Sequence, residues 1–278
     1  MVIKAKPAEK DSVRKLNAFF QSRDWKPFSF QKKTWLAYLQ GKSGLVHAPT
    51  GTGKTFAVWM PPLMEWIEEQ NTKTKSIQPG LRVLWLTPLR ALVEDTTRSL
   101  LEVVEGIGLP WTVESRTGDT SGTIKAKQRR KFPSALVTTP ESLSLLLSYP
   151  ETRSCFSDLR AVIVDEWHEL LSTKRGAQTE LCLARLRKWN PSLRTWGLSA
   201  TLGNLDQAVA TLTGNEKQGV LVDGNIRKKF VVKTLIPKNM ESFPWAGHLG
   251  GKLVKQVAEV IDKKSPTLVF TNVRSQTE

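Results

Sequence analysis

The sequence predicts an α/β fold in which helices cover both faces of a parallel β-sheet. Short apolar runs alternate along the chain with longer segments that have the apolar spacing of helices. These runs are rich in Val, Leu and Trp and become polar only at their carboxyl ends, as strands buried on both faces do. A glycine-rich loop joins one run to the next helix, which is where a doubly wound sheet binds its ligands.

The predicted elements follow one another in strand and helix order through most of the chain. Most of the helical segments begin at a proline or a polar residue, which suits the first turn of a helix. The predicted strands are 44–47, 83–87, 135–139, 161–165 and 195–199. The predicted helices are 28–40, 54–70, 89–105, 141–148, 177–189 and 205–213.

The pattern changes after about residue 215. Strand-like runs come at 220–222 and 230–236, and a helix over 248–262 is followed by a strand over 267–271. One strand and two partial helices cannot bury a core of their own. We therefore expect an N-terminal domain over 1–235 and the truncated start of a second α/β domain over 236–278, so that the chain is part of a longer protein.

The chain is strongly basic, with 41 lysines and arginines against 26 acidic residues and a net charge of +15. Such a field attracts polyanions and is strengthened by the release of their counterions on binding. Nucleic acid is the first interpretation of this charge. A solvated basic surface on an ordinary enzyme is the alternative that charge by itself leaves open.

The cysteines and the apolar runs exclude several other classes of protein. Cys155 and Cys182 have no C-x-x-C partner and no histidine at metal-ligand spacing, so the sequence predicts neither a zinc site nor a disulfide framework. The first ten residues lack the apolar segment of a signal peptide, and no apolar run reaches membrane-spanning length. We expect a reduced, cytoplasmic protein that makes no contact with a membrane.

The glycine-rich loop reads A-P-T-G-T-G-K-T from Ala48 to Thr55 and predicts the phosphate-binding loop of a P-loop NTPase. Gly51 and Gly53 let the backbone curl so that its N–H groups point at phosphate oxygens, and the following helix adds its dipole. Lys54 supplies a positive charge to the β- and γ-phosphates, and the Thr55 hydroxyl is a ligand for Mg²⁺. The strict pattern has glycine at the position of Ala48, so this loop is a variant.

An acidic pair follows the apolar run 161–164 in the sequence D-E-W-H. Asp165 is placed to hold Mg²⁺, and Glu166 is placed to orient and deprotonate the attacking water. A pair of helix-capping carboxylates is the structural alternative for these two residues. His168 has two equal interpretations, a histidine satisfied within its helix or a link between the hydrolysis site and a neighbouring loop.

Six motifs in this order resemble those of a superfamily 2 DNA or RNA helicase, and their number and order make the likeness specific. They are F-S-F-Q at 28–31, A-P-T-G-T-G-K-T at 48–55, T-P-L-R-A-L at 87–92, T-P-E at 139–141, D-E-W-H at 165–168 and S-A-T at 199–201. Four longer matches, D-E-W-H-E-L-L at 165–171, R-T-G-D-T at 116–120, F-P-W-A-G-H-L-G at 243–250 and L-V-F-T-N-V-R-S at 268–275, are similar to the large-helicase-related (Lhr) family. Within that family, the closest likeness is the bacterial ligase-associated DEXH-box branch.

The resemblance covers roughly residues 20–278 and implies a RecA-like first domain and the beginning of a RecA-like second one. It implies that Gln31 reads the adenine edge, which makes ATP the nucleotide, that Phe28 lies near the base, and that Ser199 and Thr201 couple hydrolysis to domain movement. Trp167 departs from the small aliphatic residue usual at its position. The residues expected to hold the nucleotide are Phe28, Gln31, Thr50, Gly51, Thr52, Gly53, Lys54 and Thr55.

The same resemblance implies a track for one nucleic-acid strand. Arg90 can pair with a phosphate, Thr139 and the helix after it can donate hydrogen bonds, and Gly118 can let the backbone approach closely. A solvated Arg90, a plain turn at Gly118 and a solvated basic helix over 125–131 are the alternatives. The residues expected on the track are Pro88, Arg90, Gly118, Thr139, Pro140 and Glu141.

These observations predict an ATP-dependent DNA helicase or translocase that moves on single-stranded or partly duplex DNA, in DNA repair. A DNA ligase or nuclease as partner follows from the family likeness alone. An RNA helicase or RNP remodeller is the alternative within the same class, because the shared motifs contact sugar and phosphate. A nucleotide-gated binding module without productive turnover is another, because an arginine finger, worth ~10³ to 10⁵ in rate, would lie beyond residue 278. We therefore expect this chain to bind ATP better than it hydrolyses it.

Overall fold

Seven short parallel strands form one sheet in the part of the chain that the structure describes, in the order β3, β4, β2, β5, β6, β1, β7. The structure is a computed structural model, and it describes residues 10–71, 80–214, 219–224, 231–235, 250–261 and 267–271. The strands are β1 Gly44–His47, β2 Val83–Leu86, β3 Val113–Arg116, β4 Ala135–Thr138, β5 Ala161–Val164, β6 Arg194–Ser199 and β7 Val220–Asp223. The predicted parallel sheet is confirmed.

Helices connect the strands and return the chain from the carboxyl ends of the strands to their amino ends. The helices before β3 are α1 Asp11–Gln21, α2 Ser29–Leu39, α3 Lys54–Asn71, the 3₁₀ turn η1 Arg90–Leu92 and α4 Val93–Ile107. Those after β3 are α5 Gly122–Arg130, α6 Pro140–Ser148, the 3₁₀ segment η2 Pro150–Phe156, α7 Trp167–Leu170, α8 Lys174–Trp189, α9 Leu205–Thr213 and α10 Gly250–Val260.

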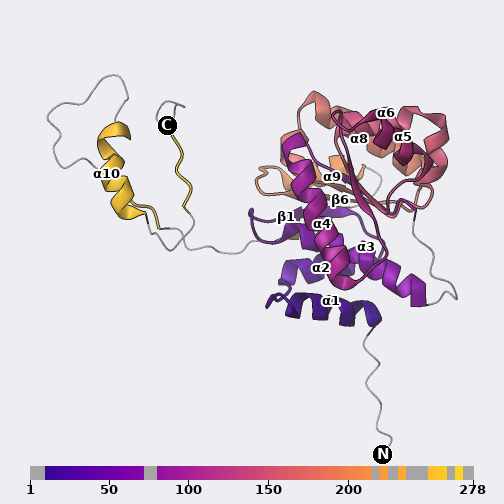
Figure 1. Cartoon of the computed structure of the whole chain (residues 1–278), viewed down its shortest axis with the longest axis horizontal. Coiled ribbons are helices and arrows are strands. Elements are labelled where there is room, and N and C mark those ends of the chain that lie inside the picture. Colours follow the sequence, from indigo (N-terminus) through magenta and orange to yellow (C-terminus); the bar gives the residue numbers. More distant parts are fainter. Residues whose placement is uncertain are drawn as a thin grey trace, which may run out of the picture. The chain divides into compact units, whose positions relative to one another are not determined.

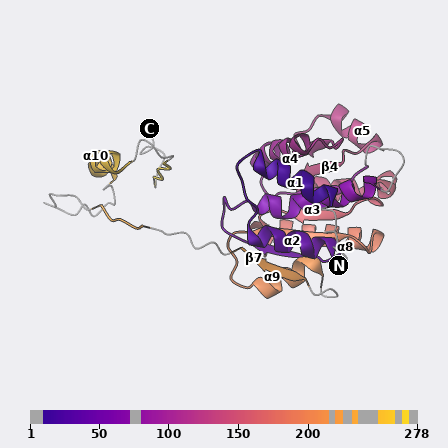
Figure 2. The ribbon, with the colours of Figure 1, turned by 90° about the horizontal axis from the view of Figure 1, so that it is seen from below.

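The sheet has a separate apolar core on each face because neighbouring side chains of a strand point to opposite sides. On β2, Val83 and Trp85 pack into the core beneath α1 to α4, whereas Leu84 and Leu86 pack into the core beneath α6 to α9. In Figure 1, α1 and α2 lie on one side of the sheet and α6 and α8 on the other, and Figure 2 views the layer of α1, α2 and α3. The carboxyl edge of the sheet is left to loops.

Strand order brings the two phosphate motifs to adjacent places on that edge. The glycine-rich loop follows β1 and the D-E-W-H box follows β5, and β6 lies between these two strands. Ser199, the last residue of β6, is in register with His47, the last residue of β1. Because all these strands are parallel, the loops that follow them open on the same side.

Several elements of the sheet domain were not predicted, among them α1, β3 and η2, and α5 was expected only as one interpretation of the basic run 125–131. Helix α1 precedes the first motif, and β3 with its return helix α5 fills the stretch between the predicted helix 89–105 and the predicted strand 135–139. The sequence of β3, V-E-S-R, is half polar because β3 lies at the edge of the sheet, where Glu114 and Ser115 are partly exposed to water. An edge strand of this kind lacks the apolar run that marks the central strands.

The contacts divide the chain into two units, Met1–Ile226 and Arg227–Glu278. In the second unit, the structure shows α10 inside the predicted helix 248–262, and it assigns no strand to residues 231–235 or 267–271. A strand is defined by its ladder, so an apolar run without a neighbouring strand is not one. The motif at 243–249, and 272–275 of the following motif, lie outside the described residues, and the boundary at 235/236 stays a prediction.

Candidate functional site

The glycine-rich loop between β1 and α3 has the backbone that its sequence requires. Gly51 and Gly53 have φ angles of 75° and 77°, in the left-handed region that glycine adopts without steric cost. The Thr52 hydroxyl donates to the Pro49 carbonyl oxygen at 2.7 Å, and the Lys54 ammonium donates to the Ala48 carbonyl oxygen at 2.9 Å. The loop therefore folds around its own lysine, which phosphate oxygens can draw away from a neutral carbonyl.

Lys54 faces the acidic pair across this edge of the sheet. Its side chain is buried, and burial lowers the pKa of the ammonium, while the carboxylates of Glu166 and Asp165 oppose that shift. The loop after β1 and the box after β5 thus present opposite charges to the same space. This is the arrangement that a magnesium nucleotide needs, with a cation for its phosphates and carboxylates for its metal.

The ionisation of Asp165 is strongly perturbed by its surroundings. Burial, together with repulsion from Glu166, raises the pKa of Asp165 to about 6. One carboxylate oxygen accepts from the Glu166 N–H at 2.9 Å and the other accepts from the Trp85 indole N–H at 3.4 Å. A carboxylate whose ionised form is costly in this way is a good partner for a cation.

Glu166 adopts φ 44° and ψ 49°, a left-handed backbone that is uncommon for a residue with a side chain. Its Oε2 is buried and has no hydrogen-bond partner. A buried carboxylate oxygen in this state can accept a hydrogen bond from a water, including a water that is bound to a cation. The described residues contain no cluster of three or more His, Cys, Asp and Glu side chains that can hold a metal by themselves. Mg²⁺ suits this donor set, because it keeps several waters and usually takes only one or two protein carboxylates.

The three predicted coupling residues lie together beside Glu166. The His168 Nδ1 lies 3.5 Å from the Glu166 Oε2 and 3.3 Å from the Ser199 Oγ. The Ser199 hydroxyl lies 3.5 Å from the Thr201 carbonyl oxygen. The His168 Nε2 also lies 3.4 Å from the Glu169 Oε1 in its own helix, so these contacts fit both interpretations of His168, a histidine satisfied in its helix and a link to a neighbouring loop. Trp167 is fully buried, and its indole N–H donates to the Ala208 carbonyl oxygen at 3.0 Å, so it ties the box to α9.

A cavity of about 660 Å³ lies between the glycine-rich loop and the turn before α2. Gln31 spans its floor, where its amide N–H donates to the Gly53 carbonyl oxygen at 2.8 Å and its Oε1 accepts from the Phe28 N–H at 2.8 Å. Each end of the amide keeps one further bond to offer. Trp25 also lines the cavity, and its ring is half-exposed like that of Phe28. The sequence analysis missed Trp25, because an aromatic residue in a turn carries no periodic signal.

The predicted track residues divide into exposed and buried groups. Arg90 and Gly118 are exposed, and the Arg90 guanidinium lies 3.7 Å from the Asp119 carboxylate. Thr139 is buried, and its hydroxyl accepts from the Ser142 N–H at 3.4 Å, so it caps α6 and is not presented to solvent. Pro140 is buried next to it. Of these four residues, only Arg90 and Gly118 are open to a strand without rearrangement.

Arg175, in the first turn of α8, connects the two remaining track residues. Its guanidinium donates to both Glu141 carboxylate oxygens, at 2.5 and 3.2 Å, and to the Pro88 carbonyl oxygen at 2.6 Å. Although burial alone would raise the pKa of Glu141, the hydrogen bonds from Arg175 lower it. The Glu141 carboxylate is therefore already paired with Arg175. The sequence analysis missed Arg175, because it belongs to no motif. The only signal in the sequence is its position ten residues after Asp165, in a segment to which no role was assigned.

Helix α5 carries the basic run that the sequence left with two interpretations. Lys125 donates to the Gly118 carbonyl oxygen at 2.7 Å, Lys127 lies 3.9 Å from Glu114, and Arg129 lies over the Tyr149 ring. Several of these cations are thus engaged within the domain.

Cys155 and Cys182 are free thiols. No helix among the described residues is long and apolar enough to cross a membrane.

Comparison with known proteins places this geometry in a family. The family model described as DEAD/DEAH box helicase matches residues 28–208. The ATP-dependent helicase Lhr-Core of Methanocaldococcus jannaschii is 33% identical over 249 residues, which cover 86% of this chain and 29% of that protein. The Lhr helicase/uracil glycosylase of Escherichia coli is 29% identical, over 92% of this chain and 19% of that protein.

A solved structure agrees with these relatives. The Mycobacterium smegmatis helicase Lhr, bound to ssDNA and AMP-PNP, is 30% identical and superposes with a TM-score of 0.68 over 87% of this chain and 31% of that one. The chain thus spans less than a third of each of these proteins. The matched region contains both phosphate motifs, the sheet edge that joins them and the residues between them. The chain belongs to the DEAD/DEAH box helicase family, and its relatives confirm the resemblance to Lhr helicases.

Proposed function

We propose that this chain forms the ATP-binding part of an ATP-dependent helicase or translocase that moves on single-stranded DNA. The observation that carries the proposal is that Lys54 lies at the same edge of the sheet as Asp165 and Glu166, near enough for both carboxylates to raise its pKa. ATP suits the cavity beside Gln31, because that cavity has two half-exposed aromatic rings and opens onto the glycine-rich loop. A role in DNA repair rests on the family likeness.

The catalytic sequence of events follows from the side chains present. Lys54 exchanges its bond to the Ala48 carbonyl oxygen for phosphate oxygens and offsets their charge. Asp165 and Thr55 would hold Mg²⁺, which supplies neutralisation of the phosphate charge. Glu166 has a free, buried Oε2 with which to orient and deprotonate the attacking water. The His168 Nδ1 lies 3.5 Å from this oxygen and 3.3 Å from the Ser199 Oγ, so a change in the charge of Glu166 would alter the contact between His168 and Ser199.

Glu166→Gln tests the hydrolytic step. The amide keeps the size of the side chain but cannot take a proton, so we expect nucleotide binding to survive and DNA-stimulated hydrolysis to fall by ~10²-fold or more. Glu102→Gln is the matched control, because this exposed carboxylate on α4 lies away from the box. Undiminished turnover in Glu166→Gln would remove this mechanism.

Substrate choice needs a separate measurement. The M. smegmatis Lhr structure contains ssDNA, and the E. coli relative is named a uracil glycosylase, which supports DNA for this chain. The alternative is RNA, which a DExH-box RNA helicase of Arabidopsis thaliana, 27% identical over 96% of this chain, keeps open. We expect matched DNA oligonucleotides to stimulate ATP hydrolysis more than RNA does. Equal or greater stimulation by RNA would favour the RNA helicase.

A further inference from the structure

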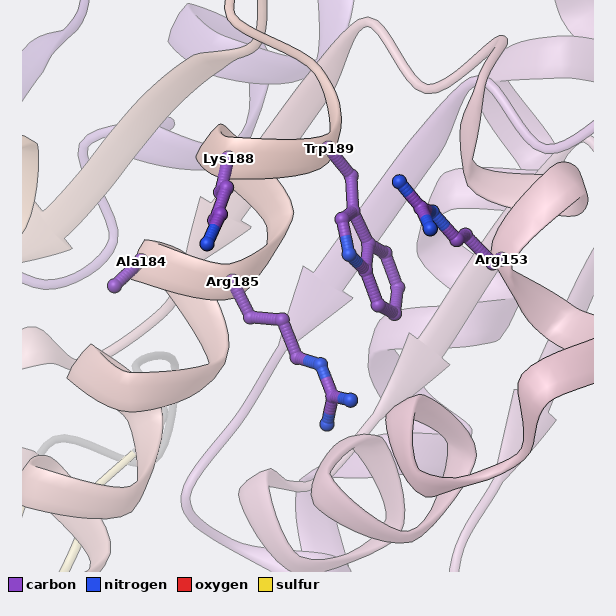
Figure 3. A pocket seen from close by; sticks show the side chains of 5 residues that line it. All are labelled: Arg153, Ala184, Arg185, Lys188 and Trp189. Carbon is purple, nitrogen blue, oxygen red and sulfur yellow. The ribbon is translucent and has the colours of Figure 1, made fainter.

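The carboxyl end of α8 carries a basic pocket that none of the predicted site residues lines. Arg153, Ala184, Arg185, Lys188 and Trp189 form its walls, and its volume is about 570 Å³. Figure 3 shows the Trp189 ring with the Arg153 side chain on one side of the view and the Arg185 side chain below it. The charged groups of the pocket thus come from two elements, η2 and α8. Strand β5 lies between these two elements in the sequence.

This pocket lies at the amino edge of the sheet, opposite the nucleotide site. Helix α8 begins after β5 and ends before β6, and these two strands are parallel neighbours. The helix therefore runs from the carboxyl edge back to the amino edge, and Trp189 is its last residue. Segment η2 precedes β5 and reaches the same edge. The pocket is a different place on the molecule from the site of Lys54 and Glu166.

Among the described residues, no carboxylate is paired with the cations of this pocket. Within the described part of the chain, no carboxylate lies within ion-pair distance of Arg153, Arg185 or Lys188. Other arginines near the same edge are paired: Arg82 and Arg160 with Glu69, and Arg194 with Glu65. Three neighbouring cations without a counter-charge create a local positive potential that an anion can lower.

Trp189 makes the pocket more ordered than a surface of free lysines. Its ring lies 5.0 Å from the Arg185 guanidinium carbon and 5.8 Å from that of Arg153, and it packs against Phe156 at 6.1 Å. Phe156 is buried, so this packing holds the Trp189 ring against the core. Cation–π contact holds the two planar guanidinium groups in place, which lowers the entropy that a bound anion would cost.

The chemistry of the lining favours phosphate groups over an acidic peptide. A peptide hot spot needs an apolar anchor in a pocket or a free sheet edge, whereas this lining offers Ala184 and an indole already in contact with two guanidinium groups. A phosphodiester backbone needs only cations at intervals, and the guanidinium fork matches phosphate geometry. We infer that this pocket is a second phosphate-binding site for the nucleic-acid strand, used where the strand extends beyond the carboxyl edge. The inference rests on the proposed function.

Oligonucleotide length separates the two sites. The triple variant Arg153→Gln, Arg185→Gln, Lys188→Gln removes the three cations from exposed positions and leaves Trp189 in place. On single-stranded DNA of ~40 nucleotides, we expect the triple variant to bind more weakly than the wild type. The slope of log K against log salt concentration should be smaller in magnitude by about 2, since each of the three phosphate contacts contributes ~0.7. On a strand of ~8 nucleotides, which covers a single track, affinity and stimulated ATP hydrolysis stay at the wild-type level.

A control of equal charge distinguishes a site from a general field. Arg14→Gln, Lys15→Gln, Lys42→Gln changes net charge by the same amount on α1 and on the turn after α2, and it should leave the slope unchanged. Equal slopes for wild type and the pocket variant on the long strand overturn the inference, as do equal losses in the control variant or on the short strand. Wild-type protein that binds neither strand overturns the proposed function instead.

Discussion

The partly buried carboxyl of Asp165 is placed where its ionised form costs stability. Its pKa is about 6, against 3.8 for an ordinary aspartate, because burial and the adjacent Glu166 disfavour the charged form. Above pH 6 the folded protein must therefore keep an ionised group where ionisation is costly. A cation beside Asp165 would remove that cost, which is why a residue so placed suits a magnesium nucleotide.

Asp165→Asn should stabilise the protein free of nucleotide and metal. The folded state binds the proton more tightly than the unfolded state, so the penalty is fully present above pH 6 and disappears as pH falls towards 3.8. We expect the variant to gain up to about 3 kcal/mol in free energy of unfolding at pH 8, and much less at pH 4. Urea unfolding with EDTA at both pH values measures this. A gain that is the same at both would contradict it.

Individual residues also show what a sequence pattern can indicate and what it cannot. Lys54 and Glu166 were predicted because the sequence around each follows a spacing that phosphate chemistry requires. Trp25 and Arg175 belong to no such spacing, since one lies in a turn and the other meets partners 34 and 87 residues away. Thr139 was predicted to face the strand, and the structure uses its hydroxyl as a helix cap. Local sequence does not say which way a side chain is turned.

At the scale of elements, α8 joins two of the turns that carry predicted track residues. Arg175 in its first turn holds Glu141 at the start of α6 and the Pro88 carbonyl after β2. Loss of this one side chain releases both turns. The track is thus positioned by an element that also continues directly from the D-E-W-H box and α7.

Arg175→Ala should weaken both the fold and the grip on nucleic acid. We expect a loss of ~1 to 2 kcal/mol in free energy of unfolding, because the pair is part-exposed, and a several-fold rise in the DNA concentration that half-stimulates hydrolysis. Arg175→Lys keeps the charge but not the fork, so it should restore only part of the loss. A double-mutant cycle with Glu141→Gln should give a coupling of ~1 kcal/mol, and additive effects would exclude the link.

Gly176, the next residue of α8, sets how closely this helix packs against α7. A Cβ atom there would lie 2.1 Å from the Leu170 carbonyl oxygen, which is backbone and cannot move aside. Gly176→Ala should therefore cost ~2 kcal/mol or more in free energy of unfolding. Gly122→Ala is the matched control, since its Cβ meets nothing within 4 Å, and it should be neutral or stabilising. Chemical denaturation compares the two, and equal stability would refute the close contact.

At the scale of the whole molecule, the sheet separates two charged surfaces by the length of its strands. The nucleotide site and the track residues lie at the carboxyl edge, and the pocket of Arg153, Arg185 and Lys188 lies at the amino edge. The positive charge that gives the chain its net charge of +15 is therefore not spread evenly over the surface. A nucleic-acid strand bound at both the carboxyl and the amino edge of the sheet would run along one side of the domain.

Nucleotide binding should stabilise the folded domain as a whole. At a concentration 100 times its Kd, a non-hydrolysable ATP analogue with Mg²⁺ should add ~2.7 kcal/mol, which raises Tm by several degrees. Lys54→Ala should remove most of that rise, because the phosphates lose their cation. Lys42→Ala, an exposed lysine after α2, should keep it. Equal rises in both variants would show that the analogue binds elsewhere.

The sequence by itself determined the parallel sheet, the two phosphate motifs and the family, because each depends on residues close together in the chain. Apolar runs predicted the five strands they mark, and the A-P-T-G-T-G-K-T and D-E-W-H segments carry their chemistry within a few residues. Tertiary structure alone decided the edge strand β3, the cavity beside Trp25, the clamp of Arg175 and the pocket around Trp189. Each of these joins groups from distant parts of the chain, and only packing brings such groups together.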